Sequence, residues 1–502
     1  MNQENSPASA SVTPHHSPGV TSVLRSPALM TRECLAGVIT ALALIPEVIS
    51  FSVVSGVAPQ VSLIASVVIC LTLSILGGRP AMVSAAAGSV ALVIGPMVHQ
   101  HGIHYILPTV VLAGILQIIF GLSGMTRMMR YIPRSVMTGF VNALGILIFF
   151  AQVPHVWGQS PVVWVFFAIT LAVVLLLPRV FTAVPAPLIA IVLVTAITWG
   201  MGYSVPNVGD EGSMSGGLPG LTQLLVPLNI TTLQIIWPTA VSVALVGMIE
   251  TLLTAKVVDD LTDTPSSKLR EATGLGIANI FAGFYGGIAG CAMIGQTIVN
   301  VGLGKARSRV STLVAGLVLL LLVSVLSRVL AHIPMVVLAA IMMVVAVKTL
   351  NWHSISPQTL KRFPLSETVI MLATVGITVA TGNLALGVVS GVLLAILWFA
   401  RRLSHVIYAD RQLSEDGRSV CYRVHGPLFF ASSNDLYEHF SYADDPSEVT
   451  IDLSSAVIWD ASTVAALDAI EQRYQRYHAR VTIIGLNGRS KELHQRLSGN
   501  LD

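Results

Sequence analysis

A carboxylate stands in the middle of a long apolar stretch at Glu250, within the sequence VGMIETLLT. An ionisable side chain is costly to place inside a membrane segment, so its presence is a functional hypothesis by default. Thr254 follows about one helical turn later and would lie on the same helix face. A carboxylate and a hydroxyl on one face can hold a small cation such as Na⁺, whereas a desolvated carboxyl group can instead take up a proton. The alternative is a glutamate that only holds helices together.

A second carboxylate, Glu47, lies in another apolar stretch, ALIPEVISF. Pro46 precedes it and is expected to break the helix at this point. Glu47 could join the same cation site, or it could simply accept hydrogen bonds from N–H groups that the break leaves free. Phe51, about one turn further along, could line a binding site, although an aromatic residue in a membrane helix also serves packing.

Two apolar stretches are interrupted by glycine and polar residues, at 83–95 and at 286–306. In the second, only about ten residues, 292–301, are expected to be helical, which is about half of the 20 or so needed to cross a bilayer. Irregular backbone at membrane depth occurs only where it is buried in protein or lines a watery cavity. The N-terminal N–H groups of a half-helix carry partial positive charge, so these stretches are predicted to form an anion site.

The residues expected around the starts of the two half-helices are small or polar. They are Ala87, Gly88 and Ser89 in the first, and Gly295, Gln296 and Thr297 in the second. Short side chains would let an anion reach the backbone N–H groups. The alternative is close helix packing, which small residues also serve. His99, His101 and His104 lie in a short outer loop without an acidic partner, and no metal site is predicted there.

The overall composition indicates a membrane body with a soluble tail. Hydrophobic residues make up 54% of the 502 residues and charged residues only 11%. Of the charged residues, 24 fall in 402–502 and 29 in the preceding 401, and this uneven spread separates a polar tail from an apolar body. The net charge of +3 gives no reason to expect a nucleic-acid partner. The four cysteines show no pair spacing, so neither a disulfide framework nor a zinc site is predicted.

Long runs without Asp, Glu, Lys or Arg contain the expected membrane segments. Splitting them at Gly, Pro and polar residues predicts fourteen, at 32–54, 61–77, 85–97, 104–122, 133–151, 161–177, 184–201, 234–258, 273–286, 291–302, 308–330, 334–348, 366–381 and 384–400. If the N-terminus is inside, the loops after even-numbered segments hold most of the basic residues and the outer loops hold almost none. This alternation follows the positive-inside rule and predicts a multi-pass inner (plasma) membrane protein with both ends in the cytoplasm.

The two halves of the membrane body, at about 32–201 and 234–400, correspond to each other. The two carboxylates lie 203 residues apart, and Gly88 and Gly295 lie 207 apart. Seven segments per half is an odd number, so the second half must have the opposite orientation in the membrane. A pair of broken segments at matching places in inverted halves indicates a transport site near the midplane.

Three domains are predicted along the chain. Residues 1–27 are rich in Ser and Pro and are expected to be a disordered tail, 28–402 form the membrane domain, and 405–502 form a small α/β domain. Strands are expected at 419–430, 449–453 and 481–486, with an amphipathic helix at 464–477 between the last two. Asp452, Ser454, Asp460 and Ser462 are interpreted as turn residues at strand ends.

Several motifs in this order resemble the sulfate permease (SulP) family, known in animals as solute carrier family twenty-six, and in particular its prokaryotic members. They are AGVITALALIPEVISFSVVSGVAPQ (36–60), GGRPAMVSAAAG (77–88), IETLLTAKVVDDLT (249–262), REATGLGIANIFAGFYGGIAG (270–290) and QTIVNVGLGKARS (296–308). The tail resembles the family's STAS domain, the sulfate transporter and anti-sigma-factor antagonist domain, through IDLSSAVIWDASTVAAL (451–467).

The resemblance implies an all-α membrane fold of seven plus seven inverted helices divided into a core and a gate, followed by a cytoplasmic STAS domain. It places the anion between the third and tenth half-helices and implies an elevator-like motion of the core, a homodimer, and a STAS domain that could bind a regulatory partner. In bacterial members an acidic residue on the eighth helix is associated with coupling to Na⁺ or H⁺. Glu250 occupies this position, and Thr254 matches a hydroxyl that some Na⁺-coupled members use.

Two residues depart from the family pattern. Many members carry Arg where this chain has Gln296, so the anion must rely on helix N-termini or on a coupled cation. Glu250 stands where bicarbonate–sodium members carry Asp, and the longer side chain makes a proton as plausible as Na⁺.

The resulting prediction is a secondary active transporter of small anions of the dicarboxylate, bicarbonate or sulfate class, coupled to H⁺ or Na⁺, with no other cofactor. The alternative is an uncoupled anion exchanger or a channel-like anion conductor, which would ignore pH and Na⁺. Nucleobase transporters share the inverted architecture but lack the C-terminal α/β domain. No nucleotide-binding loop of the form GxxxxGK[ST] is present, so ATP-driven transport is not predicted. The chain is predicted to be a transporter and not an enzyme.

Overall fold

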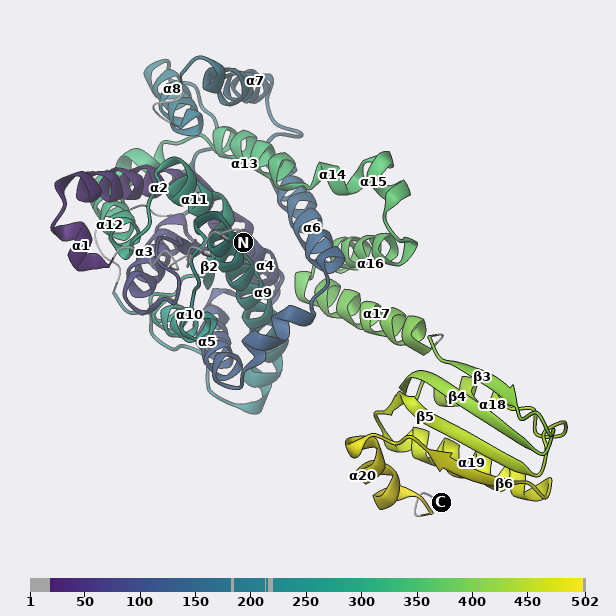
Figure 1. The fold of residues 1–502 in the computed structure, drawn as a ribbon. Coiled ribbons are helices and arrows are strands. Elements are labelled where there is room, and N and C mark those ends of the chain that lie inside the picture. Colours follow the sequence, from purple (N-terminus) through teal and green to yellow (C-terminus); the bar gives the residue numbers. More distant parts are fainter. Residues whose placement is uncertain (1–18, 182–184, 213, 215–219, 405, 500–502) are drawn as a thin grey trace, which may run out of the picture. The chain divides into compact units, whose positions relative to one another are not determined.

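The computed structural model describes residues 19–181, 185–212, 214, 220–404 and 406–499. The chain divides into two units, Met1–Gly391 and Val392–Asp502, and the division falls inside its last long helix, α17 (Leu384–Ser404) (Figure 1). Of the tail predicted over 1–27, residues 1–18 lie outside the described residues. Within the remainder, Val20–Leu24 form the short helix α1.

The helices of the membrane unit follow the predicted segments. The first half contains α2 (Pro27–Val54), α3 (Pro59–Leu76), β1 (Ser84–Ala86), α4 (Gly88–His101), α5 (Ile106–Leu122), α6 (Arg134–Gln152), α7 (Pro161–Leu176) and α8 (Ala186–Gly200). The second half contains α9 (Ile230–Thr262), α10 (Lys268–Phe284), β2 (Gly290–Ala292), α11 (Ile294–Ile298) with a π-helical continuation (Val299–Leu303), α12 (Arg309–Ala331), α13 (Met335–Thr349), α14 (Trp352–Ile355), α15 (Pro357–Arg362), α16 (Leu365–Thr381) and α17.

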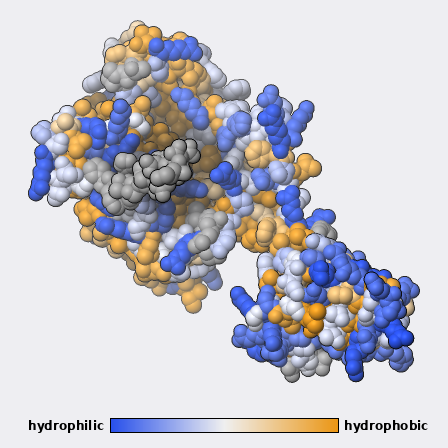
Figure 2. Space-filling model, viewed as in Figure 1, coloured by the Kyte–Doolittle hydropathy of each residue, from blue (hydrophilic) through white to orange (hydrophobic). Residues whose placement is uncertain are grey.

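Eight helices in the described residues are long and apolar enough to cross a membrane, and four shorter apolar helices accompany them. Apolar side chains also face outward from this unit, for example Val165, Leu321 and Val325, each more than half exposed. Figure 2 shows such hydrophobic residues spread over the visible surface of this unit, whereas the visible surface of the α/β domain is mainly hydrophilic. An outward apolar surface of this extent is typical of a protein bathed in lipid. The number of crossings, fourteen, stays a prediction.

Helix contacts within the membrane unit occur in matching pairs, as an internal repeat requires. Helix α3 packs on α12 and its counterpart α10 packs on α5, while α2 packs on α12 and its counterpart α9 packs on α5. A separate set repeats the pattern, because α6 packs on α16 and its counterpart α13 packs on α7. We name α2–α5 with α9–α12 the core set, and α6–α8 with α13–α17 the gate set.

Glycine allows the closest of these crossings. Helices α5 and α10 meet at Gly114 and Gly276, and a Cβ atom added to either residue would lie about 2.5 Å from the carbonyl oxygen of the other. No side chain fits there, so the two backbones approach directly. Such contact through small residues is how membrane helices gain packing energy where lipid offers no hydrophobic driving force.

The predicted break at Pro46 is wrong, because α2 continues as a helix through this residue. A proline inside a helix removes only one backbone hydrogen bond, and membrane helices tolerate it where neighbouring helices support the backbone. Pro46 is buried in the structure, so such support is present.

The C-terminal domain is a four-stranded sheet in the order β3-β4-β5-β6 with three helices (Figure 1). Its elements are β3 (Tyr408–Leu413), β4 (Ser419–Leu428), α18 (Ser433–Glu438), β5 (Glu448–Ile458), α19 (Ala461–Arg476), β6 (Arg480–Ile484) and α20 (Gly488–Leu497). Strand β3 is antiparallel to β4, whereas β4, β5 and β6 are parallel to one another. The strand–helix–strand order predicted from the sequence is confirmed by β5, α19 and β6.

Strand β3 was not predicted, and strand β5 with its turn residues differs from the prediction. Strand β5 continues to Ile458 instead of ending at residue 453, so Asp452 and Ser454 lie inside the strand and not at its end. The Asp452 carboxylate accepts hydrogen bonds from the N–H and hydroxyl groups of Ser454. Because these hydrogen bonds satisfy the polar groups locally, the strand continues through two residues whose types alone predict its end. Asp460 does act as expected of a terminal residue, since it caps the N-terminus of α19.

A buried carboxylate organises the core of this domain. The Asp445 side chain is fully buried, and one of its oxygens accepts hydrogen bonds from the hydroxyls of Tyr422 and Tyr474, both at 2.6 Å. Its other oxygen pairs with the Arg411 guanidinium at 2.8 Å. Burial raises the pKa of Tyr474, so this hydroxyl remains a donor at any physiological pH. The carboxylate thus satisfies two core tyrosines that would otherwise be buried without partners.

The substitution Asp445→Ala is expected to destabilise the α/β domain by roughly 3 kcal/mol, because buried donors left without an acceptor cost about 1–3 kcal/mol each. In the whole chain, amide exchange of β5 should then become about a hundredfold faster. The neighbouring Asp444 is exposed and serves as the matched control as Asp444→Ala. Equal exchange rates in both variants would contradict the role assigned to Asp445.

Candidate functional site

The two interrupted stretches meet as a pair of short antiparallel strands. In β1 and β2, Ser84 lies opposite Ala292, Ala85 opposite Cys291, and Ala86 opposite Gly290. A Cβ atom on Gly290 would lie 2.3 Å from the Ala85 carbonyl oxygen, so the pairing requires glycine there. The sequence prediction treated the two stretches as opposed half-helices and did not anticipate that a small sheet joins them.

Each strand leads directly into a half-helix. Helix α4 begins at Gly88, and the helix that follows β2 runs over Ile294–Leu303. The first N–H groups of a helix lack partners within it and carry partial positive charge. Since both strands belong to one sheet, both helix starts are fixed to the same central element.

Single buried side chains from neighbouring helices hold the sheet in place. The Asn279 side chain of α10 both accepts a hydrogen bond from the Gly290 N–H, at 2.8 Å, and donates one to the Gly290 carbonyl, at 3.1 Å. The Thr251 hydroxyl of α9 accepts from the Ala292 N–H at 3.0 Å, and the Ser66 hydroxyl of α3 accepts from the Ala86 N–H at 3.1 Å. These partners satisfy backbone groups that the interrupted helices leave free at membrane depth.

The Glu250 carboxylate faces this sheet from the middle of α9. It is 7% exposed, and one of its oxygens, Oε2, accepts hydrogen bonds from the Ser89 hydroxyl and, at 3.0 Å, from the Cys291 thiol. Ser89 lies in the first turn of α4. The predicted coupling carboxylate is therefore in direct contact with one of the two half-helix starts.

The Glu47 carboxylate reaches the other half-helix. It lies on α2 close to the side chain of Gln296, which is in the first turn of α11. Glu47 and Glu250 are close enough for their negative charges to repel each other. Among the described residues, no basic side chain forms an ion pair with either carboxylate. Two carboxylates thus share one site without a fixed positive charge to neutralise them.

The two helix starts differ in how open they are. The Phe51 ring covers Gly88, because a Cβ atom on Gly88 would lie 2.5 Å from a ring carbon. Gly295 is exposed, and an added Cβ atom there would meet nothing within 4 Å. The open space of the site therefore lies beside Gly295, and Phe51 forms a wall beside Gly88 and Ala87, both of which are buried.

The two predicted threonines have backbone roles in this structure. The Thr254 hydroxyl donates to the Glu250 carbonyl at 2.8 Å and approaches the Ala292 carbonyl at 3.4 Å, so it does not reach the Glu250 carboxylate. The Thr297 hydroxyl accepts from the Val83 N–H at 3.0 Å and thereby joins the second half-helix to the first broken stretch.

Sequence reasoning missed Cys291, which donates to Glu250, and Thr251, which holds β2. A search for cysteine pairs passes over a lone thiol. The sequence did contain one signal for a role of Cys291 in the site, which is its position next to Gly290 in the broken stretch.

The family comparisons agree with these features. Residues 30–163 and 159–374 match the sulfate permease family, and residues 410–499 match the STAS domain. The putative sulfate transporter YbaR of Bacillus subtilis is 45% identical over 467 residues, which cover 93% of this chain and 97% of that protein. The bicarbonate transporter BicA of Picosynechococcus is 25% identical over 523 residues, which cover 93% of this chain and 90% of that protein.

Solved structures show the same fold. The overall structure of SLC26A9 superposes with a TM-score of 0.79 and 18% identity, covering 95% of this chain and 88% of that one. The transmembrane domain of a cyanobacterial bicarbonate transporter, BicA, superposes with a TM-score of 0.64 and 25% identity, covering 72% of this chain and 97% of that one. The chain therefore belongs to the sulfate permease family of membrane anion transporters and carries a C-terminal STAS domain; it is a transporter and not an enzyme.

Proposed function

We propose that this chain is a secondary active symporter that carries a small oxyanion together with a proton. The observation that carries the proposal is Ser89, whose backbone belongs to the first turn of α4 and whose hydroxyl donates to Glu250. The anion seat and the coupling carboxylate therefore share one residue. A change in the charge of Glu250 acts directly on the group that meets the anion.

The electrostatic balance of the site explains why a cation must travel with the anion. An anion bound about 5 Å from an ionised carboxylate is repelled by about 3 kcal/mol at an effective dielectric constant of about 20. This repulsion would weaken the affinity for the anion more than a hundredfold. With Glu47 and Glu250 both ionised, the partial charges of two helix starts would have to overcome this repulsion. A proton on Glu250 removes one negative charge, and the Ser89 hydroxyl is then free to turn toward the anion.

A proton suits this site better than Na⁺. Sodium needs several oxygen ligands, whereas Oε2 of Glu250 is occupied by two hydrogen-bond donors, one of which is a thiol. The Thr254 hydroxyl, which could complete a sodium site, is directed at backbone carbonyls. The chemistry of the surrounding groups therefore favours H⁺ over Na⁺ as the coupled ion.

Backbone N–H groups beside Gly295 form the proposed anion seat, with Ala87, Gly88, Ser89, Gln296 and Thr297 around it and Phe51 as its wall. A site without a basic side chain selects anions by their size and by oxygen atoms that accept hydrogen bonds from its N–H groups. Bicarbonate, sulfate and a small dicarboxylate all meet these requirements. The relatives described above are named as sulfate and bicarbonate transporters, which supports the first two. An uncoupled anion exchanger or channel-like conductor remains the alternative function, and it would ignore an imposed pH gradient.

An elevator-type movement of the core set against the gate set is part of the proposal. The half-helices and both carboxylates all lie on the core set, so this set can carry the site as one body. An apolar cavity of about 340 Å³ lies between α2 and α12 of the core set and α8 of the gate set, and Thr195 is its one polar lining residue. An apolar seam has few directional bonds to break when one set slides along the other.

We further propose that both termini lie in the cytoplasm, because the basic residues follow the positive-inside rule. A homodimer and a regulatory partner of the STAS domain stay predictions of the family resemblance.

In proteoliposomes, Glu250→Gln is expected to abolish accumulation of sulfate or bicarbonate driven by an inward proton gradient, because the amide cannot take up the coupled proton. Exchange of labelled for unlabelled anion should persist, since the neutral side chain mimics the protonated carrier. Glu211→Gln, at the exposed end of the short 3-10 helix Val208–Glu211, is the matched control and should accumulate anion normally. Full gradient-driven accumulation by the Glu250 variant would remove this carboxylate from the coupling role.

The substitution Gly295→Val is expected to leave the fold intact and to weaken anion affinity roughly 10- to 100-fold, because the side chain would enter open space and block charge-assisted hydrogen bonds to backbone N–H groups. Gly302→Val tests the same change in an exposed residue near the end of the same half-helix. Concentration-dependent uptake and the thermal unfolding temperature should be measured for both. Unchanged affinity in the first variant would move the anion seat elsewhere.

A further inference from the structure

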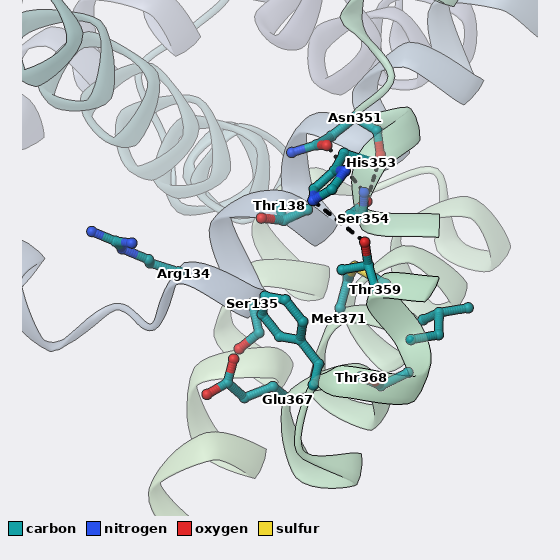
Figure 3. Close-up of a pocket in the computed structure, with 12 residues that line it drawn as sticks. Arg134, Ser135, Thr138, Asn351, His353, Ser354, Thr359, Glu367, Thr368 and Met371 are labelled. Atoms are coloured by element: carbon teal, nitrogen blue, oxygen red, sulfur yellow. Dashed lines mark hydrogen bonds between the residues drawn. The ribbon is translucent and has the colours of Figure 1, made fainter. Parts of the chain in front are cut away.

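A cavity of about 380 Å³ lies in the gate set, separate from the anion site (Figure 3). It lies between the first turns of α6 and α16 and the short helices α14 and α15. We name it the gate cavity. Neither the sequence motifs nor the proposed transport mechanism uses any residue of this cavity.

Partly buried hydrogen bonds fix the walls of the gate cavity. Asn142 of α6 donates to the Ser354 hydroxyl at 3.0 Å and accepts from the Asn351 N–H at 2.7 Å, which ties α14 to α6. Where α14 leads into α15, the Thr359 hydroxyl lies 2.8 Å from that of Ser356 and 3.4 Å from the His353 ring. The cavity is therefore a built feature and not a gap between loosely packed helices.

Two opposite charges line this cavity without pairing. Arg134 lies in the first turn of α6 and Glu367 in the first turn of α16, and among the described residues neither forms an ion pair. Figure 3 shows the two side chains extending from different helices, with the Glu367 carboxylate beside Ser135 and the exposed Arg134 side chain directed away from the other labelled residues. A ligand with one negative and one positive group would match this arrangement.

Ser135 adds an independent sign of a missing ligand. It is 9% exposed and lines the cavity, and its hydroxyl has no hydrogen-bond partner within the described part of the chain. Its backbone lies in the first turn of α6, whose N–H groups favour a negatively charged group. A buried hydroxyl without a partner costs free energy, so an acceptor atom at this place would be stabilising.

Phe363 of the gate cavity and the residues that adjoin its lining residues along the chain have the composition of a membrane–water interface. Trp352, Phe363 and Leu365 expose 59%, 50% and 79% of their surface, and the exposed basic residues Lys361 and Arg362 lie beside them. Trp together with Lys and Arg is typical of the headgroup layer, where aromatic rings contact acyl chains and basic groups contact phosphates. Lipid, and not only water, is thus available to fill the cavity.

We propose that the gate cavity binds the headgroup of a phospholipid that carries a primary ammonium, as phosphatidylethanolamine does. The phosphodiester oxygens accept hydrogen bonds from Arg134, from the Ser135 hydroxyl and from the first N–H groups of α6. The ammonium donates to Glu367, and the acyl chains pack on Phe363 and Leu365. The bound lipid bridges α6 and α16, which pack on each other, and so stabilises the gate set against which the core set moves.

The test uses the delipidated whole chain in detergent and measures its unfolding temperature after addition of phosphatidylethanolamine, phosphatidylglycerol or phosphatidylcholine. A lipid that binds only the folded state raises this temperature. Phosphatidylethanolamine should raise it most, because phosphatidylglycerol lacks the ammonium and phosphatidylcholine cannot donate hydrogen bonds to Glu367. Equal effects of all three lipids would overturn the proposal.

Variants assign the effect to the gate cavity. Arg134→Gln and Glu367→Gln should each lose the selective effect of phosphatidylethanolamine, whereas Arg362→Gln, which does not line the cavity, should keep it. Ser135→Ala should raise the unfolding temperature of the lipid-free protein, because it removes the unpartnered hydroxyl, and should reduce the shift caused by the lipid. A selective shift that survives in both charge variants would place the lipid elsewhere and refute this assignment.

Soluble glycerophosphoethanolamine separates a lipid from a free metabolite with the same charges. The lipid proposal requires that it causes a much smaller shift than the phospholipid at the same concentration. An equal shift would assign the cavity to a soluble ligand and overturn the lipid source. Because every readout is stability, failure of this proposal leaves the proposed transport function untouched, and loss of coupling in transport assays leaves this one untouched.

Discussion

Backbone polar groups inside a membrane must be satisfied by the protein itself, and the rest of this structure depends on how that requirement is met at two broken helices. Strands β1 and β2 satisfy each other, and Ser66, Thr251 and Asn279 supply the remaining partners. The first N–H groups of each half-helix have no partner within that helix. The proposed anion site places the anion at these groups, where it would supply the missing acceptors.

The carboxylates complete this arrangement because they sit on the helices that support the broken stretches. Glu250 contacts the first half-helix through Ser89, and Glu47 contacts the second through Gln296. Neither has a basic partner within the described residues. An arginine in place of Gln296 would supply a permanent positive charge, whereas this chain leaves the charge of the site to be set by what binds. In the proposed mechanism, a proton taken up by Glu250 provides the change of charge that a permanent arginine at this position would not allow.

The sequence predicted the fold well where hydrophobic runs and the glycines that interrupt them determine the positions of the helices. Each of the fourteen predicted segments coincides with a helix, and the two broken stretches lie where their glycines indicated. It failed at Pro46, where tertiary support overrides a helix breaker, and at β5, where Asp452 satisfies Ser454 locally and the strand continues. The contacts of Glu250 with Cys291 and of Phe51 with Gly88 could not be predicted, because they depend on how distant segments cross in space and not on local residue patterns.

The antiparallel pairing of β1 with β2 has a consequence for direction. Each strand comes from one half of an inverted repeat, so exchanging the two halves turns the strand pair over while leaving its antiparallel pairing the same. An ion arriving from either side of the bilayer meets two helix starts, one small sheet and one carboxylate from each half. The strand pairing by itself therefore sets no preference for import or export. In the proposed transporter, the gradients of anion and proton across the membrane would set the direction of transport, and reversing these gradients would reverse it.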